Sequence, residues 1–333
     1  VIDVYWRKVP VQRSLPDLAL YIMLFPQLIA GPIVRYIDVE REISQRKADP
    51  VMIHDGISRF IVGFAKKILL ANSMGYVADA VFAQQSINTA YAWLGVICYA
   101  LQIYMDFSSY SDMAIGMGKM FGFRFLENFD YPYIARSIRE FWRRWHISLS
   151  TWFRDYVYIP LGGSRCGRWK TYRNQIIIFL LTGFWHGASW NFVIWGLYYG
   201  IFLVLERAFL GKWLERLPSW IRHVYTLVVV LVGWVFFRCE TLPQAMSYIG
   251  SMFSFDFTNF NMISILRCFN REFYLMLAIS LIGSCPVVPR LKSLTGRSQT
   301  LGLMTDVLLL LLFFYSVCYM MGADFNPFIY FRF

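Results

Sequence analysis

Runs of apolar residues long enough to cross a lipid bilayer constrain this chain more than any other feature of its sequence. A spanning helix needs about 20 predominantly apolar residues. Only 16% of the 333 residues are charged and 57% are hydrophobic, against about 25% charged in an ordinary soluble domain. The sequence therefore excludes a water-soluble enzyme and predicts an integral membrane protein. The strongest runs are 91–105, 189–205, 223–237, 273–283 and 301–321, and the weaker ones are 18–34, 57–71 and 174–187.

The same runs predict an all-α fold, a polytopic bundle of six to nine hydrophobic helices that are not all full spans. They lack the ten-residue alternation of a membrane β-barrel. Small residues spaced four apart, Gly183 with Gly187 and Gly196 with Gly200, favour close helix packing in lipid. Long polar loops are expected at 239–272 and 284–300. We expect a single membrane domain over 1–333.

The excess of basic residues, 32 Lys and Arg against 21 Asp and Glu, is explained by membrane topology. Basic loops collect on the cytoplasmic side and contact anionic lipid, so no nucleic-acid partner is needed. Six cysteines without a C-x-x-C pair indicate neither a disulfide framework nor a metal site. The densest basic stretch is predicted to be cytoplasmic and contains Arg136, Arg139, Arg143, Arg144, Arg154, Arg165, Arg168, Lys170 and Arg173.

Aromatic residues follow a helical period through this basic stretch. Phe141, Trp145, Leu149, Trp152 and Tyr156 recur at helical spacing, which predicts one helix at the membrane interface. Its aromatic face is expected to be buried, with the arginines directed to water or lipid head groups.

Two of the four histidines are candidates for catalysis. His186 ends an apolar run, and an ionisable residue within a membrane segment indicates either a functional site or a histidine bonded between helices. His146 lies on the basic aromatic stretch, and the two histidines either flank one channel or are unrelated. His54 and His223 are expected to be interfacial.

An acidic and hydroxyl-rich segment, Y-M-D-F-S-S-Y-S-D at 104–112, is expected to close an apolar helix. Its Asp106 and Asp112 have three alternative roles: to bind a cation, to orient a histidine, or to mark where the helix meets water. No nucleotide-binding motif accompanies the segment.

Three segments together resemble the membrane-bound O-acyltransferase family: Y-M-D-F-S-S-Y-S-D-M-A-I-G at 104–116, R-E-F-W-R-R-W-H-I-S-L-S-T-W-F-R-D-Y-V-Y-I-P-L-G-G at 139–163, and G-F-W-H-G-A-S-W-N-F at 183–192. Within the family, 24–36, 160–165 and 326–333 are similar to bacterial members that O-acetylate alginate and other polymers. The resemblance implies interfacial and re-entrant helices around a central tunnel. Because such members carry further helices before the position of Val1, the chain is expected to lack an N-terminal part.

The resemblance also implies roles for particular residues. His186 matches the family's catalytic histidine and His146 its second, supporting histidine. Trp185 and Asn191 are then expected to shape the tunnel, together with Asp106. Arg143, Arg144 and Arg154 are expected to attract the phosphates of acetyl-CoA, the expected donor substrate; no bound cofactor and no metal are expected.

The expected activity is transfer of an acetyl group from a cytoplasmic donor to a periplasmic acetyltransferase partner that modifies a polysaccharide, in the bacterial inner membrane. Teichoic acid D-alanyl transfer and peptidoglycan O-acetyl transfer are the alternatives within the family. A transporter and a structural scaffold of a secretion complex are the alternatives outside it. A transporter would show paired broken helices from internal repeats, which the sequence lacks.

Overall fold

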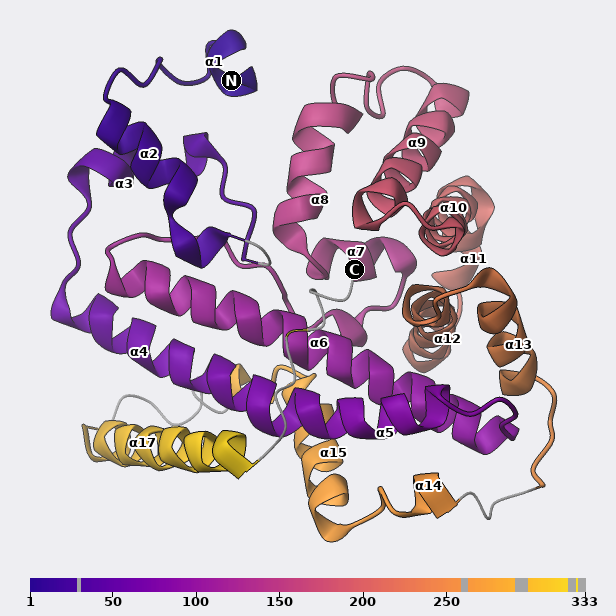
Figure 1. Cartoon of the computed structure of the whole chain (residues 1–333). Coiled ribbons are helices and arrows are strands. Elements are labelled where there is room, and N and C mark those ends of the chain that lie inside the picture. The colour runs from indigo at the N-terminus through magenta and orange to yellow at the C-terminus, as the bar shows by residue number, and fades with distance from the viewer. Residues whose placement is uncertain (29–30, 259–262, 291–298, 323–327, 329–333) are drawn as a thin grey trace.

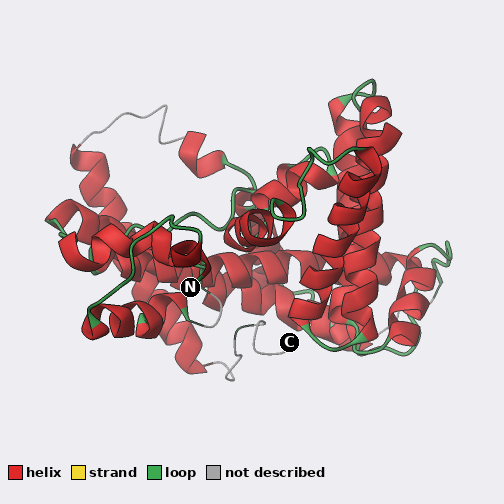
Figure 2. Cartoon of the chain, turned by 90° about the horizontal axis from the view of Figure 1, so that it is seen from above, coloured by secondary structure: helices red, strands yellow, loops and turns green. Residues whose placement is uncertain are grey.

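All of the regular secondary structure in the described part of the chain is helical. This computed structural model describes residues 1–28, 31–258, 263–290, 299–322 and 328, and no strand occurs among them. Figure 2 shows the same residues as helices joined by short loops. The predicted all-α class is confirmed.

The first half of the chain builds two long helical rods that lie side by side (Figure 1). One rod is continuous from Pro50 to Phe82 and contains a π-helical turn. The elements of this half are α1 (Ile2–Tyr5), α2 (Leu15–Met23), η1 (Phe25–Gln27), α3 (Tyr36–Gln45), α4 (Pro50–Ala65), η2 (Lys66–Ala71), α5 (Asn72–Phe82) and α6 (Thr89–Met120).

The second half adds shorter helices around these rods. Its elements are η3 (Pro132–Ile134), α7 (Ile138–Arg144), α8 (Ile147–Phe153), η4 (Arg154–Tyr158), α9 (Arg168–His186), α10 (Trp190–Leu205), η5 (Glu206–Leu210), α11 (Gly211–Leu214), α12 (Ser219–Arg238), α13 (Leu242–Met252), α14 (Ile263–Leu266), α15 (Arg271–Gly283) and α17 (Gln299–Gly322).

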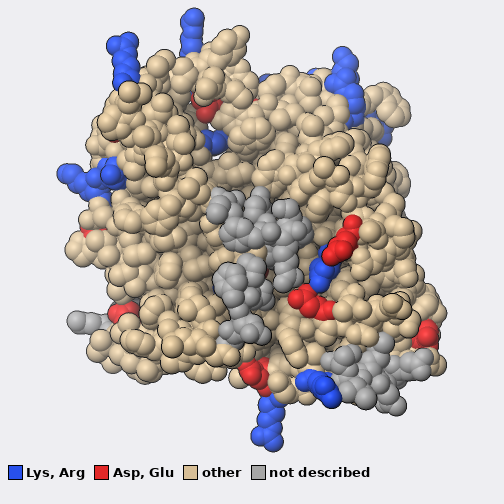
Figure 3. Space-filling view, in the orientation of Figure 1, with Lys and Arg blue, Asp and Glu red and all other residues tan. Residues whose placement is uncertain are grey.

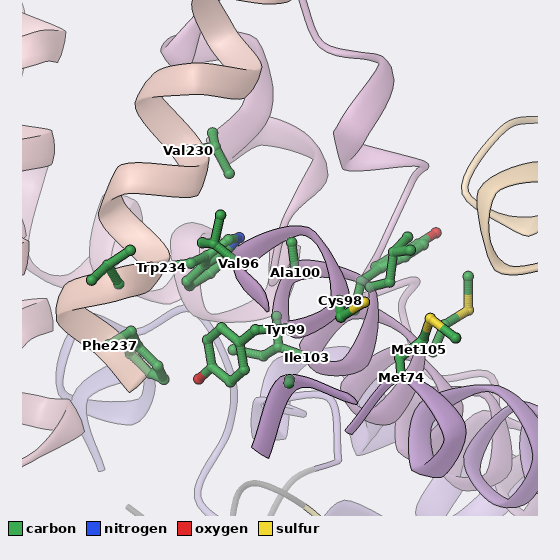
Figure 4. Packing of buried hydrophobic residues seen from close by; sticks show 14 of the residues in the cluster. Met74, Val96, Cys98, Tyr99, Ala100, Ile103, Met105, Val230, Trp234 and Phe237 are labelled. Carbon is green, nitrogen blue, oxygen red and sulfur yellow. The ribbon is translucent and has the colours of Figure 1, made fainter. Parts of the chain in front are cut away.

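Helix α6 is the core of the molecule. Most of its 32 residues are buried, as expected of a helix that is apolar on nearly every side. Figure 4 shows Val230, Trp234 and Phe237 of α12 and Met74 of α5 in the hydrophobic cluster that surrounds it. A second, smaller cluster contains Val39 and Ile43 and packs α3 onto the end of α6.

The expectation that 104–112 closes an apolar helix is wrong. Helix α6 continues to Met120, so Asp106 lies in its interior and is buried. The carboxylate of Asp106 pairs with the ammonium of Lys67 at 2.6 Å, and Asp112 pairs with Lys66 at 2.9 Å. Basic residues on the neighbouring rod thus compensate the acidic residues, which allows the helix to continue where we expected it to reach water.

Four helices are long and apolar enough to cross a membrane, among the residues described: Pro50–Phe82, Trp190–Leu214, Ser219–Arg238 and Thr300–Gly322. The weaker run 57–71 therefore belongs to a helix that is long and apolar enough to span a membrane. The run 18–34 forms helix only up to Met23 and a short turn at Phe25–Gln27, because Pro26 and Pro32 interrupt it. The expected polar loop 239–272 contains α13 and α14. Of the second expected loop, 284–300, residues 291–298 lie outside the described residues.

The predicted small-residue contacts hold α9 against α10. A Cβ atom on Gly183 would overlap the carbonyl oxygen of Phe192, and one on Gly196 would overlap that of Phe179. Only glycine permits this approach of the two backbones. The contact fixes the end of α9 that carries His186.

We expect Gly183→Val to destabilise the protein by about 1–3 kcal/mol, because the added side chain forces α9 away from α10. The measurement is the unfolding midpoint of the detergent-solubilised protein. Gly302→Val is the matched control, since nothing lies within 4 Å of a Cβ at Gly302. An unchanged midpoint for Gly183→Val would show that the close approach of α9 and α10 does not contribute to stability.

Candidate active site in an arginine-lined cavity

A cavity of about 580 Å³ lies between α8–η4 and α9. Figure 1 shows these helices next to one another, joined by the segment 159–167. One face of α9 lines the cavity from Gln175 to His186, a rise of about 16 Å along the helix. The lining residues on α9 are Gln175, Ile178, Phe179, Thr182 and His186, and those on α8–η4 include Ile147, Ser150, Thr151, Phe153, Arg154 and Tyr158.

The cavity lining carries positive charge, although one of its arginines, Arg154, also pairs with Asp155 at 2.7 Å. Arg139, Arg143, Arg154 and Arg207 line the cavity, and no acidic side chain does so among the described residues. Such a cavity attracts anions and stabilises developing negative charge, because its low-dielectric walls strengthen the field of the cations.

His186 lies where α9 ends, against aromatic side chains from two other helices. Its ring contacts Trp195 of α10 edge-on at a centroid distance of 5.1 Å and Phe237 of α12 at 4.9 Å. Phe192 lies 6.1 Å away. These rings limit the access of water to the imidazole, and the cavity is the polar side that remains.

His146 lines the same cavity from the junction of α7 and α8. The prediction of one continuous aromatic helix is wrong, because the chain breaks at this residue, whose φ of 45° is left-handed. Trp185 lies between the two histidines: its ring is 6.1 Å from that of His146 and 4.9 Å from that of His186. The break therefore accompanies the placement of the His146 ring in the cavity that His186 also lines.

Asn128 supplies the hydrogen bonds that the broken helix lacks. Its backbone carbonyl accepts from the Ile147 amide at 2.9 Å, and its side-chain Oδ1 accepts from the Ser148 amide at 3.2 Å. The same Oδ1 lies 3.0 Å from Nδ1 of His146. A residue eighteen positions before the histidine thus caps the first turn of α8 and holds the ring.

Burial keeps His146 neutral. The residue is only 4% exposed and lies outside the four candidate spans. Burial lowers its pKa far below the ordinary value near 6.5, and the nearby His186 lowers it further. A neutral imidazole has one nitrogen that can accept a proton or a hydrogen bond.

The structure places the predicted arginines differently. Arg143 and Arg154 line the cavity, whereas Arg144 is not among its lining residues. Arg144 instead pairs with Asp130 at 2.7 Å and with Glu140 at 3.0 Å. Its contacts fasten α7 to the preceding segment and are those of a structural residue.

The remaining predicted residues also lie away from the cavity lining. Asp106 pairs with Lys67 of the neighbouring rod. Asn191 is buried and donates to the carbonyl of Cys239 at 2.6 Å, which joins the start of α10 to the end of α12. Trp185 is not among the lining residues, but its ring lies beside both imidazole rings.

The other two histidines lie outside the site. His54 is exposed and bonds to Asp306 of α17 at 3.0 Å. His223 bonds through Nδ1 to the carbonyl of Ala135 at 3.1 Å. Neither lines the cavity.

Sequence reasoning missed Asn128. It lies outside all of the segments that carry the family resemblance, yet it bonds to Ser111 in one and to Ser148 in another. Ser148 in turn accepts from the Ile33 amide in a third at 3.0 Å. The sequence gives little indication of its role, because Asn128 is a polar residue between Leu126 and Phe129. Its complete burial is known only from the structure.

An all-helical membrane protein with two histidines in a positive, aromatic-walled cavity has the features of a membrane-embedded enzyme of group transfer. Residues 9–239 match the model of the MBOAT, membrane-bound O-acyltransferase, family. The chain belongs to this family and is an acyltransferase. Membership decides against a transporter or a scaffold.

Relatives of known name extend this match. A protein named probable alginate O-acetylase from Pseudomonas putida is 42% identical over all of this chain and 72% of its own length. A peptidoglycan O-acetyltransferase from Helicobacter pylori is 40% identical over 71% of this chain and 46% of its own. A teichoic acid D-alanyltransferase from Bacillus subtilis is 30% identical over 68% and 60%.

We expect Thr182→Trp to lower acyl transfer at least about tenfold, because the indole would occupy the part of the cavity between Gln175 and His186. The measurement is the O-acyl content of the modified polymer at equal amounts of protein in the membrane. Thr182→Val keeps the shape of the side chain and is the control. Normal transfer by Thr182→Trp would show that the acyl group does not pass through this cavity.

Proposed function

We propose that the chain transfers an acetyl group from a cytoplasmic thioester such as acetyl-CoA, outward across the bacterial inner membrane, for O-acetylation of an exopolysaccharide resembling alginate. The observation that carries the proposal is one cavity lined both by four arginines and by the two histidines. The relative from Pseudomonas putida, similar over the whole chain, supports alginate or a related polymer.

The proposed chemistry requires a base and a site for the oxyanion. His186 takes the proton of the acceptor hydroxyl as its oxygen forms a bond to the thioester carbon. Collapse of the tetrahedral oxyanion breaks the carbon–sulfur bond, and the departing sulfur takes the proton back from the imidazolium. The cationic cavity stabilises the oxyanion while it exists.

The arginines of the cavity are proposed to bind the phosphates of the donor. Arg143 and Arg154 lie in its lining with Arg139 and Arg207, and guanidinium groups bind phosphate in two-point geometry. The phosphates of the donor are therefore proposed to lie at the same edge of the molecule as the other basic residues of 136–173.

The basic edge is proposed to face the cytoplasm. Arg168 at the start of α9 bonds to the Ala208 carbonyl after α10, and Tyr225 near the start of α12 bonds to Glu206. The charged ends of three helices therefore meet at one edge. Figure 3 shows Lys and Arg side chains projecting at the top of the view, including the side on which α8 and α9 lie, and also at its left and bottom. Basic residues concentrate on the cytoplasmic side of membrane proteins.

The proposed acceptor is a periplasmic acetyltransferase partner that passes the acetyl group to the polymer. The outward direction of acetyl transfer is inferred from the two ends of α9. This helix begins at the basic edge and ends at His186. An acceptor that approaches the histidine end meets the donor's acyl group from the opposite side.

Peptidoglycan O-acetyl transfer is the second candidate, supported by the 40% identity to the Helicobacter pylori enzyme. It uses the same neutral acetyl group. Teichoic acid D-alanyl transfer is disfavoured by charge, since a D-alanyl thioester carries an ammonium group and the cavity presents four arginines and no carboxylate among the described residues.

We expect His186→Ala to reduce O-acetyl groups on the exported polymer by at least about 100-fold, because no other group in the proposed mechanism removes the hydroxyl proton. The variant must be present in the membrane at the wild-type amount. His54→Ala is the control, since His54 is exposed and outside the cavity. Normal acetylation by His186→Ala would refute the proposed role.

A further inference from the structure

We propose that Asn128 is a positioning residue that fixes the tautomer of His146, so that the imidazole presents an unprotonated Nε2 to the cavity. The proposal rests on the proposed function only in taking this cavity as the place of acyl transfer. It assigns to Nε2 of His146 the role of a hydrogen-bond acceptor within the cavity, beside His186, which takes the proton of the attacking hydroxyl.

The orientation of the Asn128 carboxamide follows from its partners. A backbone amide can only donate, so the atom 3.2 Å from the Ser148 nitrogen is the oxygen. The hydroxyl of Ser148 also donates to this oxygen, at 2.8 Å. The carboxamide nitrogen then donates to Oγ of Ser111 at 3.1 Å. All these groups are buried, so exchange of the oxygen and nitrogen positions would leave two donors facing one another.

The orientation of Asn128 determines the proton of His146. Oδ1 carries no hydrogen, so Nδ1 of His146, 3.0 Å away, must be the donor. A neutral imidazole has a single N–H, and Nε2 therefore has a free lone pair. Asn128 is fully buried and does not line the cavity, whereas His146 does. The ring edge that remains for the cavity is the one that carries Nε2.

No group around His146 reverses this assignment among the described residues. The titratable and charged groups that share its cavity are His186 of α9, Arg139 and Arg143 of α7, Arg154 and Tyr158 of η4, and Arg207 of η5. The four arginines are already charged and cannot accept a proton. The positive charge of each one disfavours the protonated, cationic form of His146. The neighbour from α6 is apolar: Phe107 meets the ring edge-on at 4.8 Å.

The same bonds make the tautomer depend on distant segments. The Ser148 hydroxyl that donates to Asn128 accepts from the Ile33 amide. Ser111 belongs to the long helix α6. Segments around 33, 111 and 148 thus meet at one carboxamide, and the ring of His146 takes its orientation from all three.

The test is ¹⁵N NMR of the purified full chain labelled at histidine, because protonated and unprotonated ring nitrogens differ strongly in chemical shift. The His146 signals are assigned by their loss in His146→Gln. We expect a protonated Nδ1 and an unprotonated Nε2 in the wild-type protein. Asn128→Ala is expected to lose this preference, whereas Ser111→Ala retains it because Ser148 still orients the carboxamide.

Asn128→Asp provides a second readout that a merely structural role would not change. The carboxylate accepts the same hydrogen bonds but stabilises the imidazolium form of His146. We expect the acidic limb of the pH–rate profile of acyl transfer to move upward by about 1 pH unit or more. Ser111→Ala is expected to leave the limb in place.

A wild-type spectrum in which Nε2 of His146 carries the proton would overturn the proposal. This result needs no variant, so the proposal can be tested even if Asn128→Ala fails to accumulate. An unmoved acidic limb in Asn128→Asp would also overturn it. Loss of the proposed function has a different signature: His186→Ala would acetylate normally while the spectrum of His146 stayed as described.

Discussion

The hydrogen bonds between Asn128 and the turn at His146 are the interaction on which the site depends. They lie where the aromatic period of 141–156 predicts one continuous helix and the chain instead breaks at His146. The carbonyl and carboxamide of Asn128 replace the bonds that the first turn of α8 loses, through Ile147 and Ser148. The left-handed backbone of His146 is thereby compensated, and its ring reaches the cavity.

Helix packing completes the arrangement. The chain passes along α8 and η4, turns, and returns along α9, so a histidine at the start of one arm meets a histidine at the end of the other. The glycine contacts between α9 and α10 set the position of the returning arm. Aromatic rings of α10 and α12 then enclose His186. A low-dielectric site of this kind strengthens the effect of the four arginines on an oxyanion.

The positions of the apolar helices were predictable from sequence because each long apolar run predicts a membrane helix without reference to any other segment. The turn at His146 was not predictable from sequence, because the hydrogen bonds that support it come from Asn128, in another segment. The continuation of α6 was missed for the same reason, because Lys67, the partner of Asp106, belongs to a different helix. Arg143 and Arg144 are adjacent and differ only in direction. One lines the cavity and the other pairs with Asp130, a distinction that requires the rotation of α7 about its axis.

The most direct test of the account is sided acyl transfer by the purified protein in vesicles of one known orientation. Acetyl-CoA is supplied on either face, with an acceptor hydroxyl present, and free thiol is measured. The account predicts thiol release by the wild-type chain only when donor is on the face at which α9 begins, and none above background by His186→Ala. Equal release from both faces, or release undiminished in His186→Ala, would contradict it.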